Sequence, residues 1–236
     1  LYGGHRLWRS PEVTESTYIA DNFPIQFECT SEYARFIAPV EHDGIQKVIE
    51  ITFSDEPHRA ILKHKMINQG KSAMILAPWA ISVMRAGGTA ILPHSLDLPD
   101  QMQPTHSIAI WNYSRLTDRR LFLGDQFILV RQDPTIPRAL KFGLNNRSGW
   151  AGYAVDNILF VKRFLWAPDV HFPDMNCNFE SYTNSKMLEM ESLGALSRLG
   201  PGESVDHREE WEIFADVPMP STDEDVQRNI LPVIGN

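Results

Sequence analysis

Apolar and polar residues alternate along most of this chain, which is the pattern of half-buried β-strands. In the segment 186–193, Leu188 and Met190 fall on one face of such a strand, and Glu189 and Glu191 fall on the other. The first face is predicted to enter a core, and the second to hold two carboxylates side by side on a sheet. The alternative is a solvated face of an edge strand, the commonest position for strand glutamates.

Turn residues separate the alternating segments. Ile45–Phe53 is the clearest strand, and Asn68-Gln69-Gly70 is interpreted as a hairpin turn between strands at 59–68 and 71–77. Gly200-Pro201-Gly202 is predicted to turn the chain into a strand from Val205 to Phe214.

The remaining segments complete about a dozen strands with no amphipathic helix. The other predicted strands are 25–30, 34–39, 107–113, 126–132, 138–143, 150–155 and 157–164, with a loop at 93–104 and a short helical turn at 114–120. This succession predicts an all-β chain that forms a large antiparallel β-sandwich, with a single domain over residues 1–236 and less than about a tenth of the residues in helices.

Composition narrows the class of protein. The chain has 236 residues, 43% of them hydrophobic, so one domain with a sizeable core is expected. No segment approaches the ~20 apolar residues of a membrane span. The net charge of -8 is dispersed, which argues against a nucleic-acid partner but not against a sugar. Cys29 and Cys177 form no CxxC motif, so two buried thiols are favoured over a disulfide or structural zinc.

Motifs for several kinds of chemistry are missing from the sequence: there is no P-loop, GxGxxG, GxSxG or HExxH. The eight histidines are scattered without metal-ligand spacing, so we predict no metal and no cofactor. His64 shares a face with Leu62 and Met66 and is predicted to be a core or edge histidine, with a ligand role as the lesser alternative.

Three segments carry a family resemblance: GGHRLW at 3–8, PWAISVM at 78–84 and NFESYTNSKMLEMESLG at 178–194. They resemble the galactose mutarotase (aldose 1-epimerase) superfamily and, more closely, a mutarotase-like family of bacterial proteins. The resemblance covers nearly the whole chain and implies the antiparallel supersandwich of that superfamily. Because relatives usually carry strands before the first motif, we expect N-terminal strands to be missing. A signal peptide would precede Leu1, which leaves cytoplasmic and periplasmic locations open.

The resemblance also implies a ligand and a reaction. The ligand would be a sugar or sugar acid, and the reaction would be the exchange of anomers, with a base on the anomeric hydroxyl and an acid on the ring oxygen. Glu191-Ser192 matches the Glu-Thr of the family, so Glu191 is the predicted base, with Glu189 in reserve. His5 is the candidate acid. Lys162 lies on a predicted strand, and a cation there could balance the two carboxylates.

One departure from the family leaves the activity open. True mutarotases read Asn-His where this chain reads Pro78-Trp79, and that His is their general acid. Trp79 is interpreted either as a stacking platform that holds the sugar together with Arg6, or as a core residue. Three functions therefore stay in contention: an isomerase, a non-catalytic sugar-binding domain, and a scaffold of a polysaccharide lyase or hydrolase.

Overall fold

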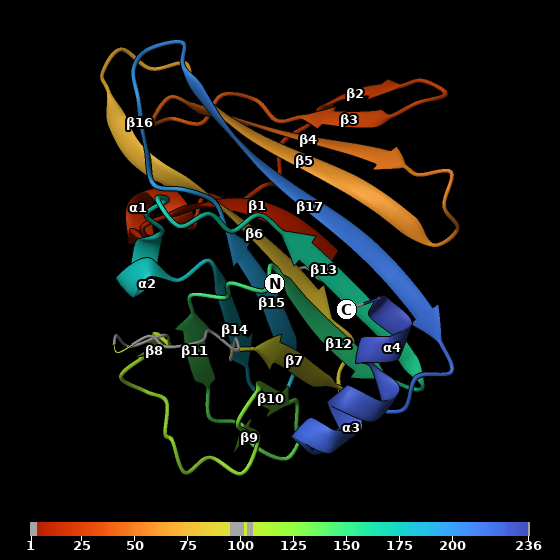
Figure 1. Cartoon of the computed structure of the whole chain (residues 1–236). Coiled ribbons are helices and arrows are strands. Elements are labelled where there is room, and N and C mark those ends of the chain that lie inside the picture. The colour runs from red at the N-terminus through yellow and green to blue at the C-terminus, as the bar shows by residue number, and fades with distance from the viewer. Residues whose placement is uncertain (1–3, 95–101, 103–105, 236) are drawn as a thin grey trace.

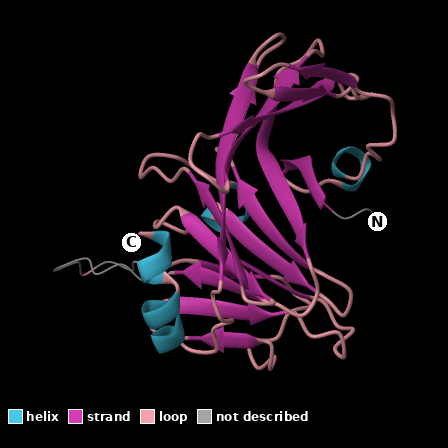
Figure 2. Ribbon diagram, turned by 90° about the vertical axis from the view of Figure 1, so that its right-hand side faces the viewer, coloured by secondary structure: helices cyan, strands magenta, loops and turns pink. Residues whose placement is uncertain are grey.

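The computed structural model describes residues 4–94, 102 and 106–235. These residues form two antiparallel sheets that pack against each other, as Figure 2 shows from the side. The predicted all-β sandwich is confirmed. Gly3, at the start of the GGHRLW motif, and most of the loop expected at 93–104 lie outside the described residues.

The smaller sheet has seven strands in the order β1-β6-β15-β14-β11-β8, and β16 pairs with the N-terminal part of β6. Its strands are β1 (Gly4–Ser10), β6 (Met74–Met84), β8 (Ile108–Ile110), β11 (Leu140–Leu144), β14 (Phe179–Thr183), β15 (Leu188–Leu193) and β16 (Ser197–Leu199).

The larger sheet has ten strands in the order β2-β3-β4-β5-β17-β13-β12-β7-β10-β9. Its strands are β2 (Gln26–Cys29), β3 (Ala34–Ile37), β4 (Ile45–Phe53), β5 (Arg59–Asn68), β7 (Thr89–Pro93), β9 (Leu121–Leu123), β10 (Phe127–Arg131), β12 (Trp150–Val155), β13 (Ile158–Phe164) and β17 (Ser204–Ala215). The strand β17 runs diagonally across the molecule in Figure 1 and joins its upper and lower parts.

The main core lies between the two sheets. Leu188 and Met190 of β15 pack there with Phe142 and Phe179 of the same sheet and with Tyr153 of the larger sheet. The alternation along β15 is therefore confirmed on its apolar side. Because side chains on a strand alternate, Glu189 and Glu191 must point to the other side of the smaller sheet.

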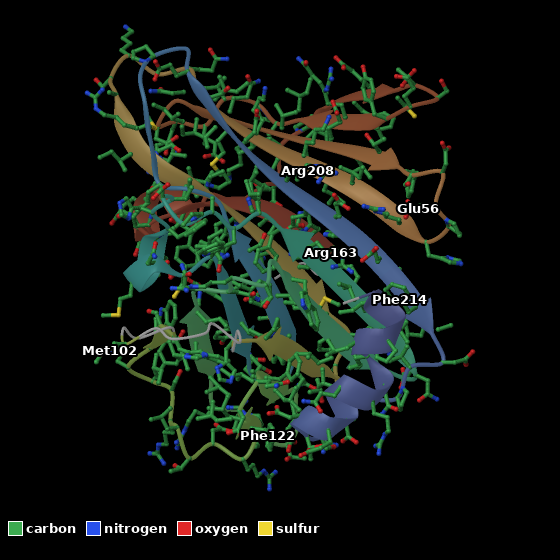
Figure 3. The ribbon with its side chains drawn as sticks, in the orientation of Figure 1. Glu56, Met102, Phe122, Arg163, Arg208 and Phe214 are labelled. Atoms are coloured by element: carbon green, nitrogen blue, oxygen red, sulfur yellow. The ribbon has the colours of Figure 1, made fainter. Side chains whose placement is uncertain are left out.

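Four short helices complete the described structure. They are α1 (Thr14–Thr17), α2 (Pro173–Asn176), α3 (Asp223–Asn229) and α4 (Leu231–Ile234). The pair α3–α4 covers the outer face of the larger sheet through Val226, Ile230 and Ile234. Arg163 and Phe214, labelled in Figure 3, lie on this covered face, where Arg163 Nη2 donates to the carbonyl of Ile234 at 2.7 Å. None of the described helices has the length and apolar character that crossing a membrane requires.

The predicted hairpin at Asn68-Gln69-Gly70 is wrong. Here the chain passes from one sheet to the other, because β5 pairs with β4 and β17, whereas β6 pairs with β1 and β15. The buried Asn68 side chain fixes this corner by donating to the carbonyls of Ser72 and Leu199 at 2.9 and 3.0 Å. A turn signal shows that the chain changes direction but not which strand it pairs with next.

Smaller expectations also differ from the structure. The segments 71–77 and 78–84 belong largely to one strand, β6, whose Pro78 lies where its neighbour changes from β15 to β16, so no sheet bond needs its missing N–H. The helical turn expected at 114–120 consists of turns, and the expectation of two buried thiols fails because Cys29 is exposed, although Cys177 is buried.

Candidate functional site

The face of the smaller sheet that points away from the larger sheet carries buried charges and aromatic rings. We call this group the outer-face site; it comprises Arg6 of β1, Trp79 of β6, Lys141 of β11, Glu180 of β14, and Glu189 and Glu191 of β15. The strand β15 lies between β6 and β14, so the edge-strand interpretation of its two glutamates is wrong. Helix α1 stands beside this face, on the right in Figure 2.

Glu191 is held by one of its two oxygens. Trp79 Nε1 donates to Glu191 Oε2 at 2.9 Å, and Lys141 Nζ donates to the same oxygen at 3.0 Å. The side chain of Glu191 is 1% exposed, and its Oε1 is buried with no hydrogen-bond partner among the residues that the structure describes. A buried acceptor without a partner costs free energy, so this oxygen has an unused capacity to accept a hydrogen bond.

Lys141 links two carboxylates. Its Nζ lies 2.8 Å from Glu180 Oε2, and the ammonium sits 4.5 Å from the ring centre of Trp79 and 4.7 Å from that of Trp111. Burial lowers the pKa of Lys141, but the attraction of Glu191 and Glu180 outweighs burial and raises that pKa above its usual range. Burial raises the pKa of Glu180 well above its usual value even with Lys141 beside it.

Glu189 forms a second ion pair with Arg6. Arg6 Nη2 donates to Glu189 Oε1 at 2.6 Å, and the Arg6 guanidinium lies 4.4 Å from the ring centre of Trp8. Burial, followed by the repulsion of Glu191, raises the pKa of Glu189 to about 7, against the attraction of Arg6. Glu189 therefore exchanges its proton near neutral pH, as a general acid or base must.

Aromatic rings flank these charges. The ring of Trp8 meets Trp79 edge-on at 5.5 Å and Tyr18 at 5.0 Å, and Trp111 stands on the other side of Lys141. Trp79 is only 5% exposed, and the Lys141 ammonium covers its ring. Of the two interpretations of Trp79, the core residue is confirmed and the free stacking platform is wrong: its ring packs with Ile81 and Leu193. Its N–H orients Glu191, whereas Trp8 and Trp111 are partly exposed.

The structure brings together four of the six predicted site residues: Arg6, Trp79, Glu189 and Glu191. It does not bring His5 and Lys162 to them. His5 precedes Arg6 on β1 and so points to the opposite face of the sheet, where it contacts His64. Lys162 is also buried between the sheets and pairs with Glu209, so the cation expected beside Glu191 is Lys141 instead.

Sequence reasoning missed three members of this region. Glu180 had a signal in the sequence: the turn at 184–187 folds β14 back on β15, and Glu180 and Glu191 are equally far from the centre of that turn, so they pair across the hairpin. Lys141 and Trp111 come from distant segments, and no local pattern in the sequence places them next to Glu191.

Comparison with known proteins places the fold. No protein-family model and no curated protein matches the chain. Among solved structures, a TPR-domain containing protein from Parabacteroides distasonis matches 93% of this chain at a TM-score of 0.58 and 13% identity. A candidate aldose 1-epimerase from Klebsiella pneumoniae subsp. pneumoniae matches 81% of it at 0.51 and 11%. The fold is that of the galactose mutarotase-like proteins.

These matches limit what can be carried over to this chain. The chain spans 39% of the length of the TPR-domain containing protein and 54% of the length of the candidate epimerase. Another neighbour, a galactose mutarotase-like protein from Lactobacillus casei, has a TM-score of 0.48 and 10% identity over 81% of this chain and 73% of its own. The first two structures, with TM-scores above 0.5, support the shared fold alone, and the function must be argued from the site.

Proposed function

We propose that the chain binds a sugar at the outer-face site and that, on a reducing aldose, it exchanges the two anomers with Glu191 as base and Glu189 as acid. The observation that carries the proposal is the difference between the two carboxylate oxygens of Glu191. One oxygen is fixed by Trp79 and Lys141, and the other is buried and without a partner among the described residues. A fixed carboxylate with one free oxygen is suited to accept a proton from a hydroxyl.

The proposed reaction uses two groups on one strand. Glu191 Oε1 removes the proton of the anomeric hydroxyl while protonated Glu189 gives its proton to the ring oxygen. The bond between the anomeric carbon and the ring oxygen then breaks and leaves the open-chain aldehyde. After rotation about the adjacent carbon–carbon bond, the ring oxygen returns its proton to Glu189 and attacks the carbonyl carbon. Glu191 returns its proton to the former carbonyl oxygen, which becomes the anomeric hydroxyl of the opposite anomer.

The charges of the site favour an uncharged sugar. Two cations, Arg6 and Lys141, face three carboxylates, and both cations are already in ion pairs with those carboxylates. A sugar acid would bring a further negative charge next to carboxylates that are already buried. Trp8 and Trp111 are partly exposed; Arg6 and Lys141 each lie over one face of these rings, so the C–H groups of a pyranose would pack against the opposite faces. His5 is left out of this mechanism because it lies on the opposite face of the sheet.

The test is polarimetry on freshly dissolved aldoses, with calorimetric binding in parallel. Glu191→Gln keeps the hydrogen bond from Trp79 but removes the base, so the rate should fall by ~10²–10⁴-fold while binding persists. Glu212→Gln is the matched control, because Glu212 lies in the other sheet, paired with Arg163 at 2.7 Å. Its rate should equal that of the wild type. A rate that survives in Glu191→Gln would refute the assigned base.

A second function is favoured by one observation. Trp79 occupies the place at which the family carries its catalytic histidine, and its N–H serves Glu191 instead of a sugar oxygen. A chain that binds sugar without turning it over fits this replacement. Two results together would select this alternative. The wild type would bind an aldose that Glu191→Gln binds more weakly, and the wild-type mutarotation rate would be no faster than that of buffer. A wild type that neither binds nor converts any aldose would reject both functions.

A further inference from the structure

A second polar cluster is buried between the two sheets, behind the outer-face site. It consists of His5 of β1, His64 of β5, Lys162 of β13, and His207 and Glu209 of β17. The side chains of Lys162 and Glu209 have no exposed surface, while that of His5, on the edge strand β1, is 12% exposed. The proposed sugar chemistry uses none of these groups.

Three members of the cluster converge on one point. His5 Nε2 lies 2.7 Å from His64 Nε2 and 4.0 Å from Glu209 Oε2, and the three ligating atoms all lie within 4.8 Å of one another. Two imidazole nitrogens at this distance cannot both point bare lone pairs at each other, so either a proton or a metal ion lies between them. We propose that His5, His64 and Glu209 form a binding site for a divalent first-row transition metal such as Zn²⁺.

The surroundings orient these groups as the outer shell of a metal site does. His64 Nδ1 faces the carbonyl of His207 at 3.0 Å, which requires an N–H on Nδ1 and leaves Nε2 free to bind a metal. His5 Nδ1 lies 2.9 Å from Ser82 Oγ, so its Nε2 is directed at the same point. Trp211 Nε1 donates to Glu209 Oε2 at 2.7 Å and holds the carboxylate in place.

The donor set selects the class of metal. Two imidazoles and one carboxylate suit Zn²⁺ and its first-row neighbours, whereas Ca²⁺ and Mg²⁺ prefer oxygen ligands alone. With Zn–N distances of about 2.0–2.1 Å in a tetrahedron, the two Nε2 atoms must separate from 2.7 Å to about 3.3 Å. His5 can move by this amount because it lies on an edge strand and is partly exposed.

The charges around the site are compatible with a dication. Glu209 Oε2, 4.0 Å from His5 Nε2, brings a carboxylate charge to the dication. Lys162 Nζ pairs with Glu209 Oε1 at 2.9 Å, whereas His5 faces the other carboxylate oxygen, Oε2. The ring of Trp211 packs against His5 at 4.9 Å and also lines a cavity of about 430 Å³.

The test is equilibrium dialysis of EDTA-treated protein against Zn²⁺, with metal content measured directly. We expect about one Zn²⁺ per chain in the wild type. His5→Asn and His64→Gln each remove a ligand, and each should weaken Zn²⁺ binding by more than the ~10–100-fold that loss of an outer-shell partner costs. His207→Asn is the matched control: its ring lies in the same cluster but supplies no ligand, so zinc should stay bound.

A second control separates this site from surface binding. The rings of His94 and His106 lie 5.1 Å apart and form another pair of imidazoles, so His94→Ala should leave the zinc stoichiometry unchanged. Loss of zinc in His94→Ala, retention of zinc in both ligand variants, or a wild type that binds no zinc would each overturn the proposal. If a ligand variant fails to fold, Co²⁺ binding to the wild type decides, because bound Co²⁺ should give visible bands of a four- or five-coordinate N/O site.

Discussion

Glu189 gives the sharpest stability test, because its pKa differs strongly between the folded and unfolded chain. Burial and the repulsion of Glu191 raise the pKa of Glu189 from its ordinary value of 4.5 to about 7. The folded chain thus holds this proton more tightly than the unfolded chain does. Stability from the protonated form is fully present below pH 4.5 and is lost as the pH rises through 7.

The magnitude follows from the pKa difference. About 2.5 pKa units at 1.36 kcal/mol each correspond to ~3 kcal/mol, which the wild type should lose between pH 4.5 and about pH 8. Glu189→Gln resembles the protonated acid in shape and still offers Arg6 an acceptor. We therefore expect this variant to be more stable than the wild type by less than about 1 kcal/mol near pH 5 and by about 3 kcal/mol near pH 8.

Urea unfolding of both proteins from pH 5 to 8.5 measures this difference directly. Other titrating groups are common to the two proteins, so they cancel when the free energies of unfolding are subtracted. Glu50→Gln is the control, because hydrogen bonds from Arg35 lower the pKa of Glu50 below its ordinary value of 4.5. The stability that Glu50 contributes is already complete above pH 4.5, so this variant should be less stable than the wild type by an amount that stays constant from pH 5 to 8.5. A pH-independent difference for Glu189→Gln, or one that favours the wild type at high pH, would refute the reasoning.

Three further predictions follow from the same structure. Lys141→Met leaves Glu180 and Glu191 without their shared cation and should cost about 3–5 kcal/mol in urea unfolding, whereas Lys186→Met, at an exposed position, should cost almost nothing. Tyr153→Phe removes a buried hydroxyl that accepts from Gly88 N at 3.0 Å and donates to the carbonyl of Arg85, so a loss of ~1–3 kcal/mol is expected from thermal or urea denaturation. The mutarotation rate, measured by polarimetry, should fall above pH 7 as Glu189 loses its proton, and a rate that stays constant to pH 9 would remove Glu189 from the role of acid.

Strand positions were predictable because alternation is a local property. Ile45–Phe53 and Trp150–Val155 were placed to the residue, and most other predicted strands end within a few residues of their observed ends. Pairing is not local, which is why the corner at Asn68-Gln69-Gly70 was interpreted as a hairpin. The helix α3 was missed although its signal is present: Thr222 precedes three acidic residues, and its hydroxyl accepts from the backbone N–H of Asp225.

Only two sources in the sequence predicted residues of the candidate site: the alternation along one strand and the resemblance to a known family. Alternation assigned Glu189 and Glu191 to a common face, and the motif segments supplied Arg6 and Trp79. Adjacent positions on a strand face opposite ways, so His5 and Arg6, neighbours in the GGHRLW motif, could not both serve one site. The burial of the two glutamates and the arrival of Lys141 depend on how distant strands pair, and no local pattern contains that information.

The outer-face site and the polar cluster between the sheets are linked through Lys162. Lys162, inside the sandwich, donates to the carbonyls of Ala80 at 3.3 Å and Met190 at 3.1 Å, and these residues immediately follow Trp79 and precede Glu191. The same ammonium binds Glu209, which also belongs to the proposed metal site. Lys162 of the buried cluster therefore holds the backbone next to Trp79 and next to Glu191 from the inner side of the sheet. A change at Glu209 removes the carboxylate that holds the Lys162 ammonium in place and contacts no side chain of the outer-face site. Its effect on the proposed sugar binding would therefore report on the spacing of β6 and β15 and not on lost contacts with the sugar.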